Sequence, residues 1–369
     1  MPNTSNILDY LDWRGDLPFA AAPFCEADNL VFCMLSFVDF SPAVSADPLA
    51  APVKLSDVWE AVREKYPNGE DFGEVIPKHV NTLFEKAAAS VRFRDVYAAG
   101  FRNVIEENEV TQFAAVTFIL PDSDDSLFIA FRGTDDTLVG WREDFHLSFT
   151  RPVRAQELAA GYIGEMASVY SGKIRTGGHS KGGNLALYGA AFCPAPARRR
   201  IVTAYSNDGP GFLREIIESP EFAELEPKVV TFVPQSSVVG MLLGHNESYQ
   251  VIESTEQNGI LQHDPFSWSV RGPSFVRLGG LSADGKRHDA ALAEWLEGIT
   301  PEERRKFTDT VFGLLASTGA KTVTDLSADR MQKLGVLAKS YTELDKDSRD
   351  NLNFFLRKLA EANIKAALE

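Results

Sequence analysis

Residues 173–190, KIRTGGHSKGGNLALYGA, hold the pattern that decides the fold. A short alternating run predicts a strand, the glycines predict a sharp turn, and the Ala- and Leu-rich continuation predicts a helix. At the turn, residues 178–182 read GHSKG and fit G-x-S-x-G, which is a nucleophile elbow when a strand precedes it and a helix follows. The pattern predicts Ser180 on a strained turn; the alternative is a glycine-rich loop in which Ser180 only caps the helix.

The composition of the chain limits the classes of protein to which it can belong. The 369 residues are 44% hydrophobic and 24% charged, which is typical of a soluble globular protein. The net charge of −15 disfavours nucleic acid and anionic membranes as partners. The opening residues lack a signal peptide, and no apolar run reaches the roughly 18 to 20 residues of a membrane helix. With three scattered cysteines, these features predict a cytoplasmic protein without a metal, a cofactor or a transmembrane segment.

The first ninety residues read as mostly helical. Helices are predicted at 29–40, at 55–65, and twice between 79 and 109 with a break near Ser90. Asp28 is the expected N-cap of the first helix, and Ser56 or Asp57 that of the second.

From residue 111 the pattern changes from helical to extended. Strands are predicted at 111–120, 127–133, 173–178, 201–206, 228–234, 249–254 and 274–280, with a polar turn at 121–125. Helical segments at 155–171 and 212–225 alternate with them. This alternation predicts an α/β fold whose sheet is mostly parallel after a first hairpin.

The last part of the chain, 286–369, lacks strand signals and is dense in charge. We therefore predict three parts: a mostly helical N-terminal segment packing on the core (1–90), an α/β core (91–285) and a helical C-terminal subdomain (286–369). The C-terminal subdomain is expected to pack on the sheet or to form a homo-oligomer contact.

A serine at a nucleophile elbow needs a histidine base, and in this architecture the chain order is serine, acid, histidine. His263 follows the last well-defined strand and is the first choice. His245 precedes that strand and is the alternative, whereas His288 lies among charged residues and is expected to be solvated.

The carboxylate that orients the histidine is harder to place. The loop after strand 228–234 carries Gln235, Ser236 and Ser237 instead of an acid. Asp208, at the end of the preceding strand, is the first choice, although it could simply cap the Gly-Pro-Gly bend that follows. Glu253 is a weaker candidate, and Asp264 is close in sequence to the histidine. A further alternative is a Ser–His dyad that has no carboxylate.

Two backbone N–H groups are expected to form an oxyanion hole. One belongs to Lys181, directly after the serine, and the other to Thr134, in the run FRGT at 131–134. Trp141 and Asp144 follow this run and are expected to support it.

These motifs together resemble the lipase class 3 (fungal-type) lipases, over about residues 91–270. The shared patterns are F-R-G-T, a following W-x-x-D (Trp141 and Asp144), and G-H-S-x-G-G at 178–183. The resemblance implies an α/β-hydrolase fold, Ser180 as nucleophile, Thr134 and Lys181 at the oxyanion hole, and a late histidine that matches His263.

The chain departs from that family in two places. The family's aspartate follows the strand equivalent to 228–234, and an apolar residue usually stands where this chain has Lys181. The runs LDYLDWRGDLPF, PQSSVVGMLL and QHDPFSW resemble more a bacterial lipase-like family, for which the resemblance implies a fold and no substrate.

The preferred functional hypothesis is an intracellular serine hydrolase that cleaves an acyl ester or thioester, including lipid esters, through an acyl-enzyme. The alternative is a catalytically inactive binding or scaffold protein of the same fold, favoured by the polar Lys181 and the unusual position of the acid.

Overall fold

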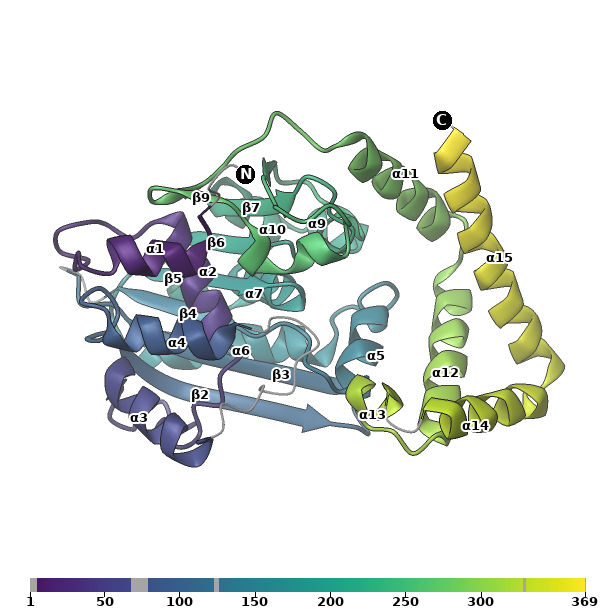
Figure 1. Ribbon diagram of the computed structural model, residues 1–369, viewed down its shortest axis with the longest axis horizontal. Helices are drawn as coiled ribbons and strands as arrows, with labels where there is room; N and C mark the ends of the chain where they lie inside the picture. The colour runs from purple at the N-terminus through teal and green to yellow at the C-terminus, as the bar shows by residue number, and fades with distance from the viewer. Residues whose placement is uncertain (1–4, 68–78, 123–125, 328–329, 369) are drawn as a thin grey trace.

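A central eight-stranded sheet organises the molecule in this computed structural model, which describes residues 5–67, 79–122, 126–327 and 330–368 (Figure 1). The strands lie in chain order: β1 (Val53–Lys54), β2 (Tyr97–Glu106), β3 (Thr111–Ile119), β4 (Leu127–Phe131), β5 (Ile174–His179), β6 (Ile201–Asn207), β7 (Val229–Pro234) and β8 (Tyr249–Ile252). Strands β1 to β4 pair antiparallel and β4 to β8 pair parallel. The predicted α/β class is confirmed.

The helices between the parallel strands cover one face of the sheet. Adding parallel strands in one direction through right-handed crossovers places all the connecting helices on the same face. These helices are α5 (Leu138–His146), α6 (Arg154–Val169), α7 (Lys181–Phe192), α8 (Ala195–Arg198), α9 (Arg214–Ile217) and α10 (Pro220–Leu225). Tyr162 of α6 and Leu185 of α7 share a buried cluster with Ile129 and Phe131 of β4, so this face is closed by apolar contacts.

The N-terminal helices cover the opposite face. They are α1 (Ile7–Arg14), α2 (Glu26–Leu35), α3 (Leu55–Lys65) and α4 (Val80–Ala89). Successive side chains of a strand point to opposite faces, and Phe128 of β4 packs on Phe32 of α2, with ring centroids 5.2 Å apart. Arg92 and Asp28, both buried, form a bidentate ion pair of 2.6 and 2.7 Å that ties this segment to the core.

The main error of the sequence analysis lies between residues 79 and 109. The first predicted helix is α4, which ends before Ser90 as expected, but residues 97–106 form strand β2 and not a second helix. β2 pairs with β3 over almost its whole length, and this long-range pairing overrides a weak helical stripe.

Smaller corrections concern helix caps and the last strand. Asp28 is not an N-cap: Cys25 caps α2, and Asp28 lies inside the first turn, where its carboxylate accepts the N–H of Cys25. Helix α3 has the predicted bounds, but Lys54 and not Ser56 or Asp57 stands at its N-cap. The predicted strand 274–280 shrinks to β10 (Ser274–Phe275), which pairs with β9 (Val270–Arg271), and Arg277 beyond it makes an isolated bridge to Ile252 of β8. In the predicted turn 121–125, residues 123–125 lie outside the described residues.

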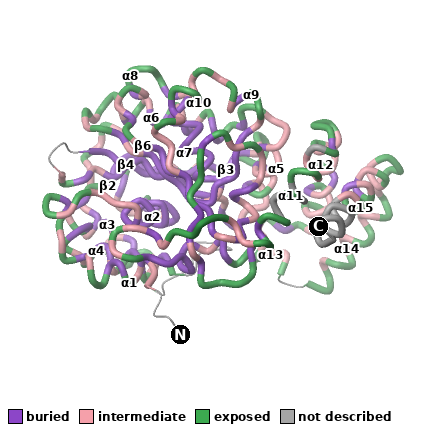
Figure 2. Tube along the Cα trace, turned by 90° about the horizontal axis from the view of Figure 1, so that it is seen from above, coloured by how far each residue is buried: buried purple, intermediate pink, exposed green. Residues whose placement is uncertain are grey.

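In the described residues of the C-terminal part, five helices stand beside the core on the side of α5 (Figure 1). They are α11 (Ala283–Glu297), α12 (Pro301–Ser317), α13 (Val323–Ser327), α14 (Arg330–Glu343) and α15 (Lys346–Leu368). Their described residues are mostly half-buried or exposed, in contrast to the sheet (Figure 2).

Backbone hydrogen bonds, ring contacts and an ion pair dock these helices on the core. The N–H of Leu138 donates to Lys321 O (2.8 Å), and that of Val323 donates to Asp136 O (2.9 Å). Phe312 of α12 packs on Phe145 of α5, with ring centroids 5.7 Å apart. None of the helices in the described part of the chain combines the length and apolar character that a membrane crossing requires.

Candidate active site

Ser180 stands on a strained turn between β5 and α7. Its backbone has φ 58° and ψ −134°, a conformation that is costly for a residue with a side chain. A Cβ on Gly178 would overlap the backbone of Gly182, and one on Gly182 would overlap Phe131 O. Strand, helix and the neighbouring β4 therefore meet so closely here that only glycine fits two positions before and two after the serine.

Asp208 and His263 come together at the carboxyl ends of the parallel strands. Asp208 directly follows β6, and its Oδ2 lies 2.6 Å from His263 Nδ1. Asp208 is fully buried and His263 is 7% exposed. The other carboxylate oxygen accepts a hydrogen bond of 2.5 Å from Ser237 Oγ. A serine thus occupies the position after β7 where an acid was expected, and it helps to hold the acid supplied by β6.

His179 fixes the loop that carries His263. Its Nε2 lies 2.8 Å from His263 O, and the two rings lie 4.4 Å apart. Burial, together with the neighbouring His263, lowers the pKa of His179 well below its ordinary value. The imidazole is therefore neutral and donates from Nε2 to the carbonyl. The sequence analysis missed this role; the only signal was the position of His179 directly before the elbow serine.

The run 131–134 packs against the elbow, as expected for an oxyanion loop. A Cβ on Gly133 would lie 3.2 Å from Ser180 Cβ, so Thr134 lies close to the serine. Within the described residues, neither the N–H of Thr134 nor that of Lys181 donates a hydrogen bond. Thr134 Oγ1 donates to Asp144 Oδ2 at 2.6 Å, which fixes the orientation of the loop. Trp141, from the same motif, is 37% exposed and borders the cavity at Ser180.

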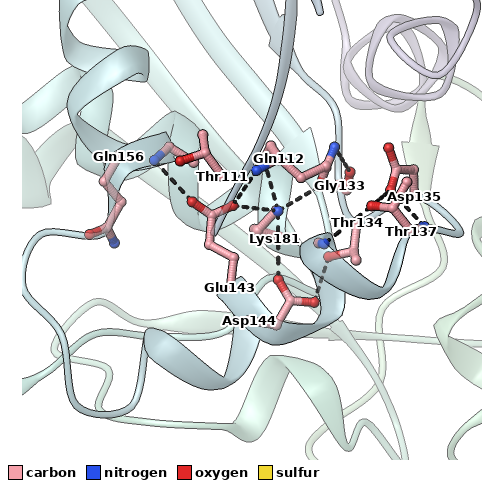
Figure 3. A network of polar contacts seen from close by, with 12 residues as sticks. Thr111, Gln112, Gly133, Thr134, Asp135, Thr137, Glu143, Asp144, Gln156 and Lys181 are labelled. Atoms are coloured by element: carbon pink, nitrogen blue, oxygen red, sulfur yellow. Dashed lines mark hydrogen bonds and ion pairs between the residues drawn. The ribbon is translucent and has the colours of Figure 1, made fainter. Parts of the chain in front are cut away.

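The side chain of Lys181 turns into the protein and ends in a buried polar network (Figure 3). Its ammonium donates to Gln112 O (3.0 Å), to Gln112 Oε1 (2.5 Å) and to Glu143 Oε2 (3.0 Å). Glu143 also accepts the backbone N–H groups of Gln112 and Ala155. All three ammonium donors are satisfied, so this polar residue keeps its backbone N–H at the elbow without placing a free charge beside the serine.

Asp144 lies at the edge of this network. Its Oδ1 is 3.8 Å from Lys181 Nζ and has no hydrogen-bond partner among the described residues. Burial raises the pKa of Asp144 to about 6, although Lys181 and the hydrogen bond from Thr134 act in the opposite direction. With a pKa of about 6, Asp144 changes charge below neutral pH, and it accepts the hydrogen bond from Thr134 that orients the loop at 131–134.

A cavity of about 360 Å³ opens at Ser180. Both Ser180 and His263 border it, as do His179, Thr134, Lys181 and Asp144. The core contributes mainly apolar side chains to the rest of the lining, namely Phe37, Trp141, Phe145, Leu147, Leu242 and Leu243. A second cavity of about 530 Å³ lies among α12, α14 and the start of α15, and none of the predicted site residues borders it.

Comparison with known proteins places the chain in a family. A family model described as Mbeg1-like matches residues 87–313, which is more than half of the chain. The chain belongs to the Mbeg1-like family. The match starts near the end of α4 and includes the elbow, the oxyanion loop, both histidine candidates and the first C-terminal helices.

Similar solved structures are lipases. The Rhizomucor miehei lipase propeptide complex is 14% identical, with 67% of this chain and 80% of that chain covered and a TM-score of 0.37. The Lip2 lipase from Yarrowia lipolytica is 10% identical, with 65% and 89% covered and a TM-score of 0.31. No curated protein sequence matches the chain. The predicted α/β fold rests on the eight-stranded sheet and its helices, and the lipases are structures to which the chain is similar.

In this Mbeg1-like chain, the alternative histidine His245 lies elsewhere. His245 Nδ1 is 3.0 Å from Glu247 Oε1, and His245 does not border the cavity at Ser180. The side chain of His288 lies outside the described part of the structure. Among the sequence candidates, the structure therefore brings His263 to the elbow cavity.

The alternative acids also have other surroundings. Asp264 Oδ1 accepts the N–H of Phe266 at 3.0 Å and caps a short turn. Glu253 follows β8, where its backbone N–H donates to Val276 and its carbonyl accepts from Ser269. Across the described residues, no group of three or more His, Cys, Asp and Glu side chains could hold a metal ion.

Proposed function

We propose that this Mbeg1-like protein is a serine hydrolase that cleaves an acyl ester or thioester through an acyl-enzyme on Ser180. The observation that carries the proposal is the 2.6 Å contact between Asp208 and His263, in a cavity that Ser180 shares with His263. A serine on a strained elbow, an imidazole and a buried carboxylate are the three groups that acyl transfer requires.

The proton movements follow from the hydrogen bonds of His263. Its Nδ1 donates to Asp208, which leaves Nε2 unprotonated and able to take the proton of Ser180 Oγ. The serine oxygen then bonds to the ester carbonyl, and the leaving alcohol or thiol departs with that proton. A water molecule repeats the sequence and releases the acid. Asp208 stabilises the imidazolium in both halves of the reaction.

The backbone N–H groups of Thr134 and Lys181 would stabilise the negative charge on the carbonyl oxygen. Neither donates elsewhere in the described structure, and Lys181 is the first residue of α7, where the helix dipole favours an anion. Because the Lys181 ammonium is paired with Glu143, the stabilisation would come from these fixed amides.

The apolar lining supports an acyl group as the part of the substrate that the cavity accepts. The volume of about 360 Å³ is at the small end of ligand sites. An ester of a medium-length fatty acid or a lysolipid would place its acyl chain against Phe37, Phe145 and Leu147, with its carbonyl at the serine.

The alternative, an inactive binding or scaffold protein, drew on two features of the sequence. Lys181 is satisfied by Gln112 and Glu143, and Asp208 stands at the histidine from a neighbouring strand. Both features are therefore compatible with an active site, and no observation favours the alternative. The cytoplasmic location and a homo-oligomer through the C-terminal helices stay predictions.

The test is covalent labelling with a fluorophosphonate, together with hydrolysis of p-nitrophenyl esters. The wild type is expected to take up one label and to hydrolyse the esters, and Ser180→Ala to do neither. Ser168→Ala is a matched control, because its hydroxyl donates to Glu165 O on the exposed side of α6. A wild type without label or turnover, or equal labelling of Ser180→Ala, would contradict the proposal.

A further inference from the structure

The C-terminal helices supply one wall of the cavity at Ser180. They lie on the side of the core where α5 follows the oxyanion loop (Figure 1). The residues on this wall are Trp295 and Leu296 of α11, Arg304, Phe307 and Thr308 of α12, and Phe355 of α15. We call this set the C-terminal wall. A ligand that fills this cavity would therefore contact helices that belong to neither the sheet nor its crossovers.

Half of the residues of the C-terminal wall are aromatic, and their rings pack on one another. The rings of Phe307 and Phe355 stack at 4.1 Å, and Trp295 meets Phe355 edge-on at 5.6 Å. Phe307 also lies 6.3 Å from Phe145 of α5. The wall is therefore an ordered surface that continues the apolar lining of the core.

Arg304 is the exception on this wall, because its charge has no partner. Within the described residues, its guanidinium makes no ion pair, and its Nε–H is shielded from water without an acceptor. Burial lowers the pKa of Arg304 from its ordinary value. Trp295 Nε1 is also shielded and unpartnered in the described structure. The wall therefore carries N–H donors and lacks acceptors for them.

The carboxylates named next already interact with groups other than Arg304. Glu303 accepts the N–H of Thr300 at the start of α12, and Asp309 pairs with Arg142 at 2.7 Å. The carboxylate that borders the cavity, Asp144, accepts from Thr134 and faces Lys181. By contrast, Arg200, whose pKa burial also lowers, donates to three backbone carbonyls.

A partly buried guanidinium without a counter-charge is costly, and the cost disappears when a ligand brings an anion. We propose that Arg304 binds an anionic group, a phosphate or a carboxylate, on the alcohol side of an acyl ester whose carbonyl lies at Ser180. The planar guanidinium matches either anion with two parallel hydrogen bonds. This inference rests on the proposed function for the reaction, but the anion site itself can be tested without catalysis.

The kinetic test compares three octanoyl esters below their micelle concentrations: octanoylglycerol, its 3-phosphate, and the octanoyl ester of glyceric acid. We expect Arg304→Gln to lower kcat/KM for at least one anionic ester about 10- to 100-fold, with a loss at least about 10-fold smaller on the neutral ester. Arg304→Lys should retain part of the preference. Arg305→Gln is the matched control, because Arg305 stacks on Phe149 and does not border this cavity.

The outcomes separate the two anions and the two proposals. A loss confined to one anionic ester identifies that group as the ligand, and equal losses on all three esters, or none, would overturn the inference. Binding of octyl phosphate, with octyl glucoside as neutral ligand, is measured by calorimetry on Ser180→Ala with and without Arg304→Gln. Arg304-dependent binding without ester turnover would leave the anion site standing and remove the proposed function. Ester turnover that does not depend on Arg304 would leave the proposed function standing and overturn the anion site.

Discussion

The two walls of the cavity at Ser180 differ in how their polar groups are satisfied. On the core side, the Lys181 ammonium has three acceptors and the Asp208 carboxylate has two donors. On the C-terminal wall, Arg304 and Trp295 present N–H groups without acceptors in the described structure. Apart from Asp144, whose Oδ1 has no hydrogen-bond partner in the described structure, the core side holds groups whose positions are fixed before a substrate arrives, and the C-terminal wall holds groups that a substrate could complete.

The difference indicates that the two walls have different roles, acyl transfer on the core side and substrate recognition on the C-terminal wall. Acyl transfer needs donors and a base that are already in place, because reorganising them during the reaction costs energy. Recognition of one substrate over another needs only groups that are better satisfied with that substrate than without it. In this chain, the first set comes from the ends of β5 and β6 and the loops after β4 and β8, and the second from α11 and α12.

The largest expected effect lies on the core side, at the base. His263→Ala should lower ester turnover by about 10⁵- to 10⁶-fold, because removing the base of such a triad leaves only binding and the oxyanion hole. His245→Ala is the matched control and should stay within about 10-fold of the wild type, since His245 pairs with Glu247 away from the cavity. Steady-state hydrolysis of a p-nitrophenyl ester measures both variants. A loss of this size in His245→Ala, together with nearly unchanged turnover in His263→Ala, would exchange the two roles.

The buried pair beneath the elbow should matter more for stability than for chemistry. Lys181→Met leaves Glu143 buried without its counter-charge, and we expect the free energy of unfolding to fall by about 3–5 kcal/mol. Adding Glu143→Gln to Lys181→Met removes the uncompensated charge and should recover at least about 1 kcal/mol. Urea unfolding of the three proteins is the measurement. A double variant as unstable as the single one would show that the charge of Glu143 is not the cause.

The core side should also respond to pH through Asp144. Because the folded-state pKa is raised to about 6 by burial, the folded protein binds more protons than the unfolded chain between about pH 4 and 6. The stability that this group contributes is present below pH 4 and is lost as the pH rises through 6. We expect wild type to lose about 1–3 kcal/mol relative to Asp144→Asn over this window. Urea unfolding at pH 4 and pH 7 measures it, and parallel changes in both proteins would contradict the assignment.

The smallest expected effect lies where the C-terminal helices meet the core. Arg142 and Asp309 form an ion pair of 2.7 Å, but their side chains are 35% and 51% exposed. Asp309→Asn should therefore change the free energy of unfolding by less than about 1 kcal/mol. The free energies of unfolding of wild type and variant are measured in urea at low and at high salt. A difference above about 1 kcal/mol that shrinks at high salt would show that this ion pair, rather than the contact of Phe145 with Phe312, holds the helices in place.

Local patterns predicted the strand, turn and helix at Ser180, and His263, the predicted base, borders the cavity there, while its role stays a proposal. The spacing of Gly178 and Gly182 leaves no other residue type that fits, and His263 follows the last strand where the chain order of such a fold places a base. The position of Asp208 near the histidine could also be predicted from the sequence, since the ends of neighbouring parallel strands meet at one edge of the sheet.

What the sequence could not reveal depends on contacts between distant segments. Strand β2 was read as a helix because its pairing with β3 leaves no local signal. The partners that satisfy Lys181 come from β3 and α5, so its polarity looked like an argument against catalysis. The approach of Arg304 to the cavity depends on how a separate set of helices docks, which no motif encodes.

The central claim, that Asp208 orients the base from the end of β6, is tested most directly by the rate of phosphonylation of Ser180. A fluorophosphonate is reacted with wild type, Asp208→Asn and Asp264→Asn, and the label is mapped by mass spectrometry. We predict labelling of Ser180 in all three, with a rate about 10³- to 10⁴-fold lower in Asp208→Asn and near that of the wild type in Asp264→Asn. Equal rates in wild type and Asp208→Asn, or a loss confined to Asp264→Asn, would contradict the account.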